Sequence, residues 1–459
     1  MTPTTKLAIA LGFMMAGCAE GVADPAGAPE PIGSTGPNGA FAGAGTAMTP
    51  LPTTGLADPE TSPYSELYEN GLTLYSHTAL VTPTEVKEPL TFPNISVYKF
   101  GTTGRGPLCM RGGDYFVETR DGSSEDLLVF LEGGGVCLDE LCAATVSPFL
   151  SLRLLSAGDV IGFGGILDKS DSRNPFSDYD VVHSPYCDGS IYAGDVDREL
   201  SDGKWINGTH DPAYQRGLQN LTATFEVAKR RYPTPRRVVL AGTSGGGYGV
   251  LVGVAMARYY YPNVPLLVVA DSGAPILTSE DPDFIQRIMR EINADHLLPA
   301  SCTNCFANGN ATDIVEWAMA RDPGLTLAYM GHAQDHVIGE FFMGSTAEQF
   351  QATVLRETGR LASRYPSRVA RFIIPGDHHM FLIDGHQIPD GVQHTVLGAF
   401  GTAVFTGDAV TAAEMRTWTI GGLTETGRNA FGVSVSGYDW LRQAERNLAL
   451  TPDIVDPGP

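Results

Sequence analysis

The sequence predicts an α/β fold, built on a doubly wound, mostly parallel sheet with helices on both faces. Short continuous apolar runs that end at a glycine or an aspartate recur along the chain, as expected for parallel strands buried on both faces. Segments with apolar residues at helical spacing lie between these runs, where parallel strands need crossover connections. In such a sheet, ligands bind beyond the carboxyl ends of the strands.

Five apolar runs are predicted strands. They span residues 127–131, 238–241, 266–270, 325–330 and 372–374. The first ends at consecutive glycines, the second at Gly242 and the third at Asp271. These exits are therefore the first places in which to look for a site.

Two helices are predicted next to the strand at 238–241. Before it, Asp211 is positioned to cap a helix with Pro212 at its first position, and apolar residues at helical spacing follow on one face. These residues are Tyr214, Leu218, Leu221 and Phe225. After the strand, an apolar helical stretch runs from about Tyr248 to Arg258.

The N-terminus has the layout of an export signal. A basic residue, Lys6, precedes an apolar run and then the small pair Ala16 and Gly17 before Cys18. This order resembles a bacterial lipoprotein signal, with Cys18 as the lipidated first residue of the mature chain. We expect a cell-envelope lipoprotein at the outer membrane or cell surface, or a secreted protein if Cys18 carries no lipid.

Three segments are predicted along the chain. Residues 1–17 form the signal, and residues 18–61 form a linker of Ala, Gly, Pro and Thr that has too few large apolar residues to fold. Residues 62–459 form a single folded domain, in which no internal repeat of solenoid length is present.

The charge excludes two classes of partner. Lys and Arg number 30 and Asp and Glu number 52, which gives a formal net charge of -22. We expect no binding to nucleic acid or to an anionic lipid surface, since both attract basic proteins. Because no segment has about 18 uninterrupted apolar residues, we expect membrane attachment only through a lipid. We also expect a monomer.

Six cysteines remain when Cys18 is set aside, an even number in an oxidising compartment. The spacing of Cys302 and Cys305 also occurs in metal sites, but neither a second such pair nor a suitably spaced histidine pair accompanies it. We therefore predict a local disulfide between Cys302 and Cys305.

Ser244 is the candidate nucleophile. It lies in the sequence Gly-Thr-Ser-Gly-Gly, residues 242–246, directly between a predicted strand and a predicted helix. Such a sharp turn lifts the serine oxygen above the sheet, and flanking glycines avoid clashes in it. The strand-turn-helix context favours a nucleophile elbow over an ordinary glycine-rich turn.

A serine nucleophile needs donors for the oxyanion of its intermediate. The amide of Gly245 follows the nucleophile, and Gly134 and Gly135 lie in the glycine turn directly after the strand at 127–131. Glycines let the main chain approach a substrate closely. We expect these three amides to form the oxyanion hole.

The acid and the base are expected later in the chain, because hydrolases with such an elbow carry serine, acid and histidine in that order. His378 and His379 lie just beyond the last predicted strand, and either can serve as the base. Asp271 and Asp335 both satisfy the order for the acid. Asp335 is favoured, because one further crossover after Asp271 brings the acid next to the histidine loop.

Several sequence blocks occur in a characteristic order. They are LEGGGVC at 131–137, GFGGIL at 162–167, NP at 174–175, YCDGS at 186–190 with GD at 194–195, and GTSGG at 242–246. In this order they resemble the pectin acetylesterase and Notum family over roughly residues 95–390. The resemblance implies an α/β-hydrolase-like fold, a Ser-Asp-His triad and hydrolysis of carboxylic esters.

Matched residue by residue, the resemblance assigns Ser244 as nucleophile, Asp335 as acid and His379 as base, with His378 as the fallback. We expect acyl transfer to Ser244 followed by hydrolysis of the acyl-enzyme. This chemistry needs neither a metal nor an organic cofactor, and we expect none.

The resemblance also implies two further disulfides. One joins Cys137 to Cys142 near the oxyanion turn, and the other joins Cys109 to Cys187.

The expected partner is an ester substrate. The chain departs from the family pattern at Gly135 and Val136, where the family commonly has a tryptophan, so we carry over the reaction and not the substrate. Pectin is a polyanion, which a chain of this charge repels. A neutral acetylated polysaccharide, a lipid-like ester or a small ester is the expected substrate.

Two alternatives stay open. The first is a catalytically silent hydrolase fold that serves as a tethered binding or adhesion module. The second is a thioesterase or amidase, since these reactions use the same triad and oxyanion hole.

Overall fold

The structure is a computed structural model of the chain. It describes residues 50–52, 54–87, 94–110, 112–137, 164–199, 212–273, 283–306, 309–383 and 421–456. The predicted signal, Cys18 and most of the predicted linker lie outside these residues. The chain contacts the folded body before residue 62, since the Ala57 amide donates to the Tyr259 carbonyl at 2.8 Å.

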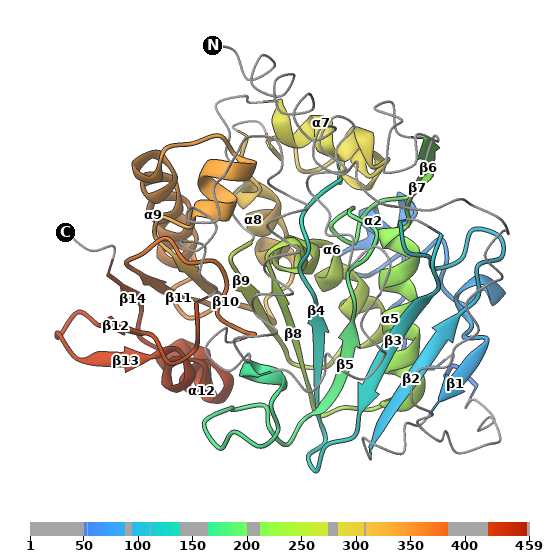
Figure 1. Cartoon of the computed structure of the whole chain (residues 1–459), viewed down its shortest axis with the longest axis horizontal. Coiled ribbons are helices and arrows are strands. Elements are labelled where there is room, and N and C mark those ends of the chain that lie inside the picture. The colour runs from blue at the N-terminus through green and yellow to red at the C-terminus, as the bar shows by residue number, and fades with distance from the viewer. Residues whose placement is uncertain are drawn as a thin grey trace, which may run out of the picture.

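A ten-stranded sheet forms the centre of the molecule (Figure 1). In spatial order its strands are β1 (Glu85–Lys87), β2 (Ile95–Phe100), β3 (Tyr115–Arg120), β5 (Asp180–Ser184), β4 (Asp126–Leu131), β8 (Arg237–Thr243), β9 (Leu266–Asp271), β10 (Leu325–His332), β11 (Val369–Ile374) and β14 (Ile454–Val455). The pairs from β1 to β5 are antiparallel, and all pairs from β5 to β14 are parallel. The predicted mostly parallel, α/β-hydrolase-like sheet is confirmed, and all five predicted strands belong to it.

Helices cover both faces of the sheet. They are α2 (Ser65–Glu69), α5 (Gly217–Arg231), α6 (Gly245–Tyr260), α7 (Phe284–Glu291), α8 (Thr312–Arg321), α9 (Ala347–Arg364) and α12 (Gly437–Asn447). Helices α5 to α9 share one hydrophobic cluster with Leu127 and Val129 of β4. Helix α12 packs on the opposite face with Leu128 and Phe130 of the same strand. Because successive β4 side chains enter two cores, the strand is apolar throughout.

The helix predicted to begin at Pro212 starts later, so this prediction was wrong. Residues Pro212–Gln215 form strand β7, which pairs antiparallel with β6 (Val196–Glu199). Helix α5 begins at Gly217 and buries Leu218, Leu221 and Phe225 of the predicted apolar face, whereas Tyr214 lies in β7. The pairing of β7 with β6 depends on contact between two separate segments, which helical spacing does not reveal.

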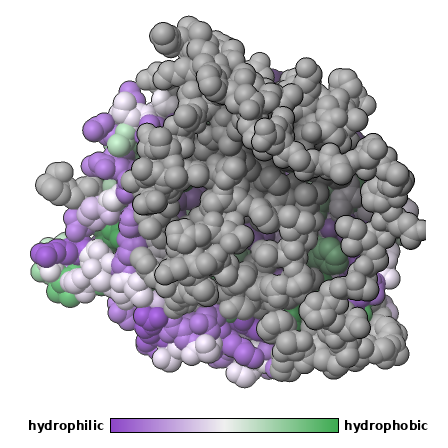
Figure 2. Space-filling view, in the orientation of Figure 1, coloured by the Kyte–Doolittle hydropathy of each residue, from purple (hydrophilic) through white to green (hydrophobic). Residues whose placement is uncertain are grey.

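A short hairpin of β12 (Thr426–Arg428) and β13 (Ser434–Ser436) projects at the left edge of Figure 1. Its turn exposes Phe431 and Val433, and hydrophobic surface lies there in Figure 2, whereas the lower edge of the described surface is mostly hydrophilic. Two exposed apolar side chains make too small a patch to indicate a docking surface. Within the described ranges, no helix has the length and apolarity needed to cross a bilayer.

Candidate active site

Ser244 lies at the sharp turn between β8 and α6. Its backbone has φ 52° and ψ -120°, a region that residues other than glycine rarely occupy. Its amide donates to the Asp271 carbonyl at 2.9 Å, which ties the turn to the end of β9. The strand, strained serine and helix have the geometry of a nucleophile elbow.

Two glycines let the turn after β4 pack against the serine turn. A Cβ on Gly133 would lie 2.5 Å from the Thr243 carbonyl oxygen and 2.8 Å from Ser244 Cβ. A Cβ on Gly246 would lie 2.1 Å from the Leu131 carbonyl oxygen. Both positions therefore need glycine, and the two motifs predicted from the sequence are in direct contact.

The three glycines predicted to form the oxyanion hole lie together. A Cβ on Gly245 would lie 3.5 Å from the Gly134 amide nitrogen and 3.3 Å from the Gly135 carbonyl oxygen. Gly135 has φ 86°, in the left-handed region that favours glycine. Main-chain groups of both turns thus meet beside Ser244.

Tyr186, from the YCDGS block, forms two hydrogen bonds with this turn. Its hydroxyl donates to the Gly135 carbonyl at 2.7 Å, and its amide donates to Glu132 Oε2 at 3.0 Å. The hydroxyl also accepts a hydrogen bond from the Ile191 amide at 2.8 Å. Tyr186 is fully buried. The sequence marks this block as specific to the family, but it does not show that the tyrosine holds the glycine turn.

Asp335 and His379 form a buried hydrogen-bonded pair. His379 Nδ1 lies 2.8 Å from Asp335 Oδ2 and 3.1 Å from Oδ1. Asp335 follows β10 and His379 follows β11, and these strands pair in parallel, so both loops emerge at the same edge of the sheet. The Ile338 amide donates to Asp335 Oδ1 at 3.1 Å and helps to fix the carboxylate. The structure thus brings together the favoured acid and the favoured base.

Asp271, the alternative acid, holds the loop that carries His379. Its Oδ2 accepts hydrogen bonds from the Phe381 and Leu382 amides, each at 2.8 Å. Burial raises the pKa of the Asp271 carboxyl to about 7. Since its main-chain carbonyl also accepts from the Ser244 amide, Asp271 connects the serine turn to the histidine loop.

His378, the alternative base, belongs to a second cluster. Its Nδ1 lies 3.4 Å from Glu425 Oε1, and His332 Nε2 lies 2.9 Å from Glu425 Oε2. The hydrogen bond with Glu425 raises the pKa of His378. Burial alone would raise the pKa of Glu425, but its hydrogen bonds with both histidines hold that pKa well below its usual value. His378 therefore contacts Glu425, whereas His379 contacts Asp335.

An apolar pocket of about 120 Å³ opens beside Ser244. Besides Ser244 and Gly245, its wall consists mainly of aliphatic and aromatic side chains from α6, α7, α8, β9 and β10. The large ones include Phe284, Met289 and Trp317, and Phe342 joins them from the segment Val337–Phe342. Such a wall favours a hydrocarbon group over a charged one.

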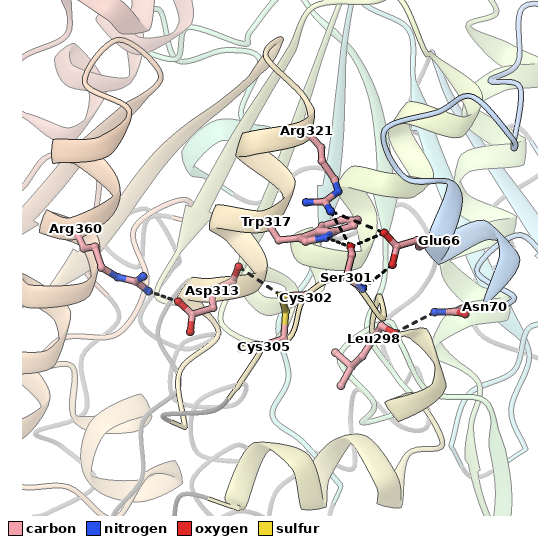
Figure 3. Close-up of a disulfide and its surroundings, with 10 residues drawn as sticks. All are labelled: Glu66, Asn70, Leu298, Ser301, Cys302, Cys305, Asp313, Trp317, Arg321 and Arg360. Carbon is pink, nitrogen blue, oxygen red and sulfur yellow. Dashed lines mark hydrogen bonds and ion pairs between the residues drawn. A yellow bond between two sulfur atoms is a disulfide. The ribbon is translucent and has the colours of Figure 1, made fainter.

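Figure 3 shows the predicted disulfide between Cys302 and Cys305. Leu298 and Phe306, on either side of it in the chain, line this pocket. Beside the disulfide, Ser301 Oγ accepts hydrogen bonds from Trp317 Nε1 at 2.9 Å and from Arg321 at 2.7 Å. The Ser301 amide donates to Glu66 Oε2 at 2.8 Å. Helices α2 and α8 are thus joined through the disulfide loop, behind the indole that lines the pocket.

Cys109 and Cys187 form the disulfide that the resemblance implied, with their Cα atoms 4.9 Å apart. The Met110 amide donates to the Cys187 carbonyl at 2.8 Å, so the same contact also anchors the YCDGS block. Cys137 is disulfide-bonded, and its predicted partner Cys142 lies outside the described residues. Disulfides fit an exported protein.

Comparison with known proteins confirms the predicted family resemblance. Residues 101–310 match the family model described as pectinacetylesterase. The chain is 25% identical to pectin acetylesterase 11 of Arabidopsis thaliana over 220 residues, which cover 45% of this chain and 54% of the relative. It is 27% identical to palmitoleoyl-protein carboxylesterase notum1' of Xenopus laevis over 218 residues, 42% of each chain. It is 28% identical to palmitoleoyl-protein carboxylesterase NOTUM of Homo sapiens over 220 residues, 43% of this chain and 42% of the relative.

The similarity covers only part of the proteins compared. The chain spans about half the length of the curated relatives it matches. The matched range contains Ser244 and the glycine turn after β4 but ends before Asp335 and His379. For those two residues, the evidence is therefore their contact in the structure.

Proposed function

We propose that this protein is a serine carboxylesterase of the pectinacetylesterase family. Ser244 attacks the ester carbonyl, His379 takes up the serine proton, and Asp335 orients the imidazole. The observation that carries this proposal is the buried Asp335–His379 hydrogen bond, at 2.8 Å, in a fold that also holds a strained serine at a strand-helix turn.

The oxyanion forms next to the glycine turn. We expect the amides of Gly134, Gly135 and Gly245 to donate to the negative oxygen of the tetrahedral intermediate. The alcohol leaves with the proton that His379 holds, and a water molecule then attacks the acyl-enzyme after giving its proton to the same imidazole. Release of the carboxylic acid restores Ser244.

The pocket supports an apolar acyl group as the part of the substrate that enters next to Ser244. A cavity of 150 Å³ in another protein takes up benzene, so a pocket of about 120 Å³ accommodates a short hydrocarbon chain of several carbons. The alcohol part then faces away from this wall. A net charge of -22 supports a neutral alcohol part over a polyanionic one such as pectin.

Export and anchoring are further parts of the proposal. The disulfides of the described chain support passage to an oxidising compartment. Cys18 and the preceding apolar run support a lipid anchor on a flexible linker, which would place the esterase at the cell envelope.

Hydrolysis of nitrophenyl esters from acetate to palmitate by the purified mature chain tests this proposal. We expect activity to rise from acetate toward hexanoate, because burial of each added methylene contributes about 0.8 kcal/mol of favourable free energy. Activity should fall for longer chains, once the pocket is full. Ser244→Ala should lower kcat by at least about 10³-fold without loss of stability.

The matched control is Ser123→Ala, which removes a hydroxyl from an exposed turn and should leave kcat unchanged. Ser244→Ala activity equal to that of Ser123→Ala on every ester would contradict the esterase proposal and favour a binding module. Activity that is greatest on acetate and declines steadily would contradict the proposed acyl pocket alone.

A further inference from the structure

A cluster of two histidines and one glutamate lies next to the candidate base and takes no part in the reaction proposed above. His332 is at the end of β10, His378 follows β11, and Glu425 lies just before β12. One nitrogen or oxygen from each side chain lies within 4.8 Å of the others. The three residues come from three separate segments, and the fold brings their potential ligand atoms to one point.

The spacing of these atoms fits a small metal ion. His332 Nε2 lies 2.9 Å from Glu425 Oε2, and His378 Nδ1 lies 3.4 Å from Glu425 Oε1. In a tetrahedral zinc site with ligands at 2.0 to 2.1 Å, neighbouring ligand atoms are about 3.3 Å apart. Because the third separation, between one nitrogen of each histidine, is within 4.8 Å, a shift of at most about 1.5 Å would place three ligand atoms around one ion.

Neighbouring residues pack closely around the cluster. The His332 side chain has no exposed surface and stacks on Phe381 with ring centroids 4.2 Å apart. A Cβ on Gly421 would lie 2.6 Å from His332 Cε1 and 2.8 Å from Glu425 Oε1. A side chain at residue 421 would therefore fill the space next to the potential ligands, and glycine leaves it open.

The hydrogen bonds of the cluster do not satisfy all of its polar atoms. His332 Nδ1 is buried and has no hydrogen-bond partner among the described residues. Buried polar groups are normally paired, so this nitrogen is an exception. The nitrogen that faces Glu425, and that the proposed ion would use, is Nε2.

We propose that His332, His378 and Glu425 bind one divalent transition-metal ion. Two imidazoles and one carboxylate form a ligand set typical of Zn²⁺, and they leave a fourth position for water. The ion would join the ends of β10 and β11 to the segment before β12.

The ion would stabilise the loop that carries the candidate base. His378 adjoins His379 in the chain, and the Gly421 amide donates to the His379 carbonyl at 3.3 Å. The cluster is therefore connected to His379 by the peptide bond after His378 and by the hydrogen bond from Gly421, which lies beside His332 and Glu425. This role is structural and goes beyond the proposed esterase activity, so either proposal can fail without the other.

Zinc binding by the mature chain, after removal of metals with a chelator, tests the proposal. We expect calorimetric titration with Zn²⁺ to show one site per chain, and Zn²⁺ to raise the melting temperature. Co²⁺ in place of Zn²⁺ should give the visible absorption of a low-coordinate site. These readouts do not depend on ester hydrolysis.

Substitutions locate the site. His378→Ala and Glu425→Gln should each weaken Zn²⁺ binding by about 100-fold or more. His378 is the safer variant for folding, because its side chain is 33% exposed. The matched control, His296→Ala, removes an exposed histidine elsewhere and should leave binding unchanged. If the unmodified chain binds no Zn²⁺, or if His378→Ala binds it as tightly as His296→Ala, the proposal is wrong.

Discussion

Replacing Tyr186 by phenylalanine removes a single oxygen next to the candidate oxyanion hole. That oxygen donates to the Gly135 carbonyl at 2.7 Å and accepts from the Ile191 amide at 2.8 Å. The aromatic ring and its packing remain. The variant therefore tests whether the hydroxyl holds the glycine turn in its active geometry.

The cost in stability follows from the two groups that lose their partner. Leaving the buried Gly135 carbonyl without a hydrogen bond costs about 1–3 kcal/mol. Leaving the half-buried Ile191 amide without one costs less. We therefore expect Tyr186→Phe to lower the free energy of unfolding by about 2–4 kcal/mol. Removal of one oxyanion donor costs about 10²–10³-fold in kcat. Because the turn in Tyr186→Phe is loosened and not deleted, we expect kcat to fall by about 10- to 100-fold.

Urea unfolding and ester hydrolysis, measured on the same preparation, separate the two effects. The control is Tyr261→Phe, which removes another buried hydroxyl, one that donates to the Tyr232 carbonyl at 3.0 Å. Tyr261 directly follows α6, at the opposite end of the helix from Ser244. Tyr261→Phe should lose stability but keep its kcat. If Tyr186→Phe also keeps its kcat, the hydroxyl contributes only to stability, and the proposed role of Tyr186 at the oxyanion turn is refuted.

The two candidate acids give further predictions. Asp335→Asn should lower kcat by about 10⁴-fold, because the amide no longer favours the imidazole tautomer that accepts the serine proton. Asp271→Asn should keep most of the activity, since an amide oxygen can accept the same two main-chain hydrogen bonds; the opposite ranking of kcat would identify Asp271 as the acid. Burial raises the pKa of Asp271 from 3.8 to about 7, so its contribution to stability is greatest at low pH and is lost as pH rises through about 7. Between pH 5 and pH 8 the stability of the unmodified chain relative to Asp271→Asn should fall by about 3 kcal/mol in urea unfolding, and a difference that does not change with pH would show that this carboxyl has an ordinary pKa.

The parallel core of the fold is predictable because each strand carries its own signal. The run at 127–131 is apolar at every position, since its side chains enter cores on both faces of the sheet. Strands β2 and β3 are harder to predict, because Lys99 and Glu118 interrupt their apolar pattern. Their partners across the sheet, and not their own residues, make them strands.

The candidate site also contains residues that the sequence predicts and residues that it does not. Ser244 and the glycine turn are visible in the sequence because each depends on its immediate neighbours. Asp271 and Asp335 give the same local signal, since each follows a parallel strand, and only their contacts distinguish them. His332 and Glu425 are 93 residues apart in the chain, so their pairing leaves no pattern that spacing could reveal.

The last strand at the edge of the sheet determines when the proposed active site can be complete. Strand β14 pairs with β11, and the Asp456 amide donates to the Ile373 carbonyl at 2.8 Å, just before the loop that carries the candidate base. During synthesis from the N-terminus, the serine turn and the pocket can form long before residues 421–456 exist. The histidine loop gains its last supports only when this segment arrives. A ribosome-bound chain is thus expected to lack the proposed esterase activity, and that activity would report that the whole body has folded.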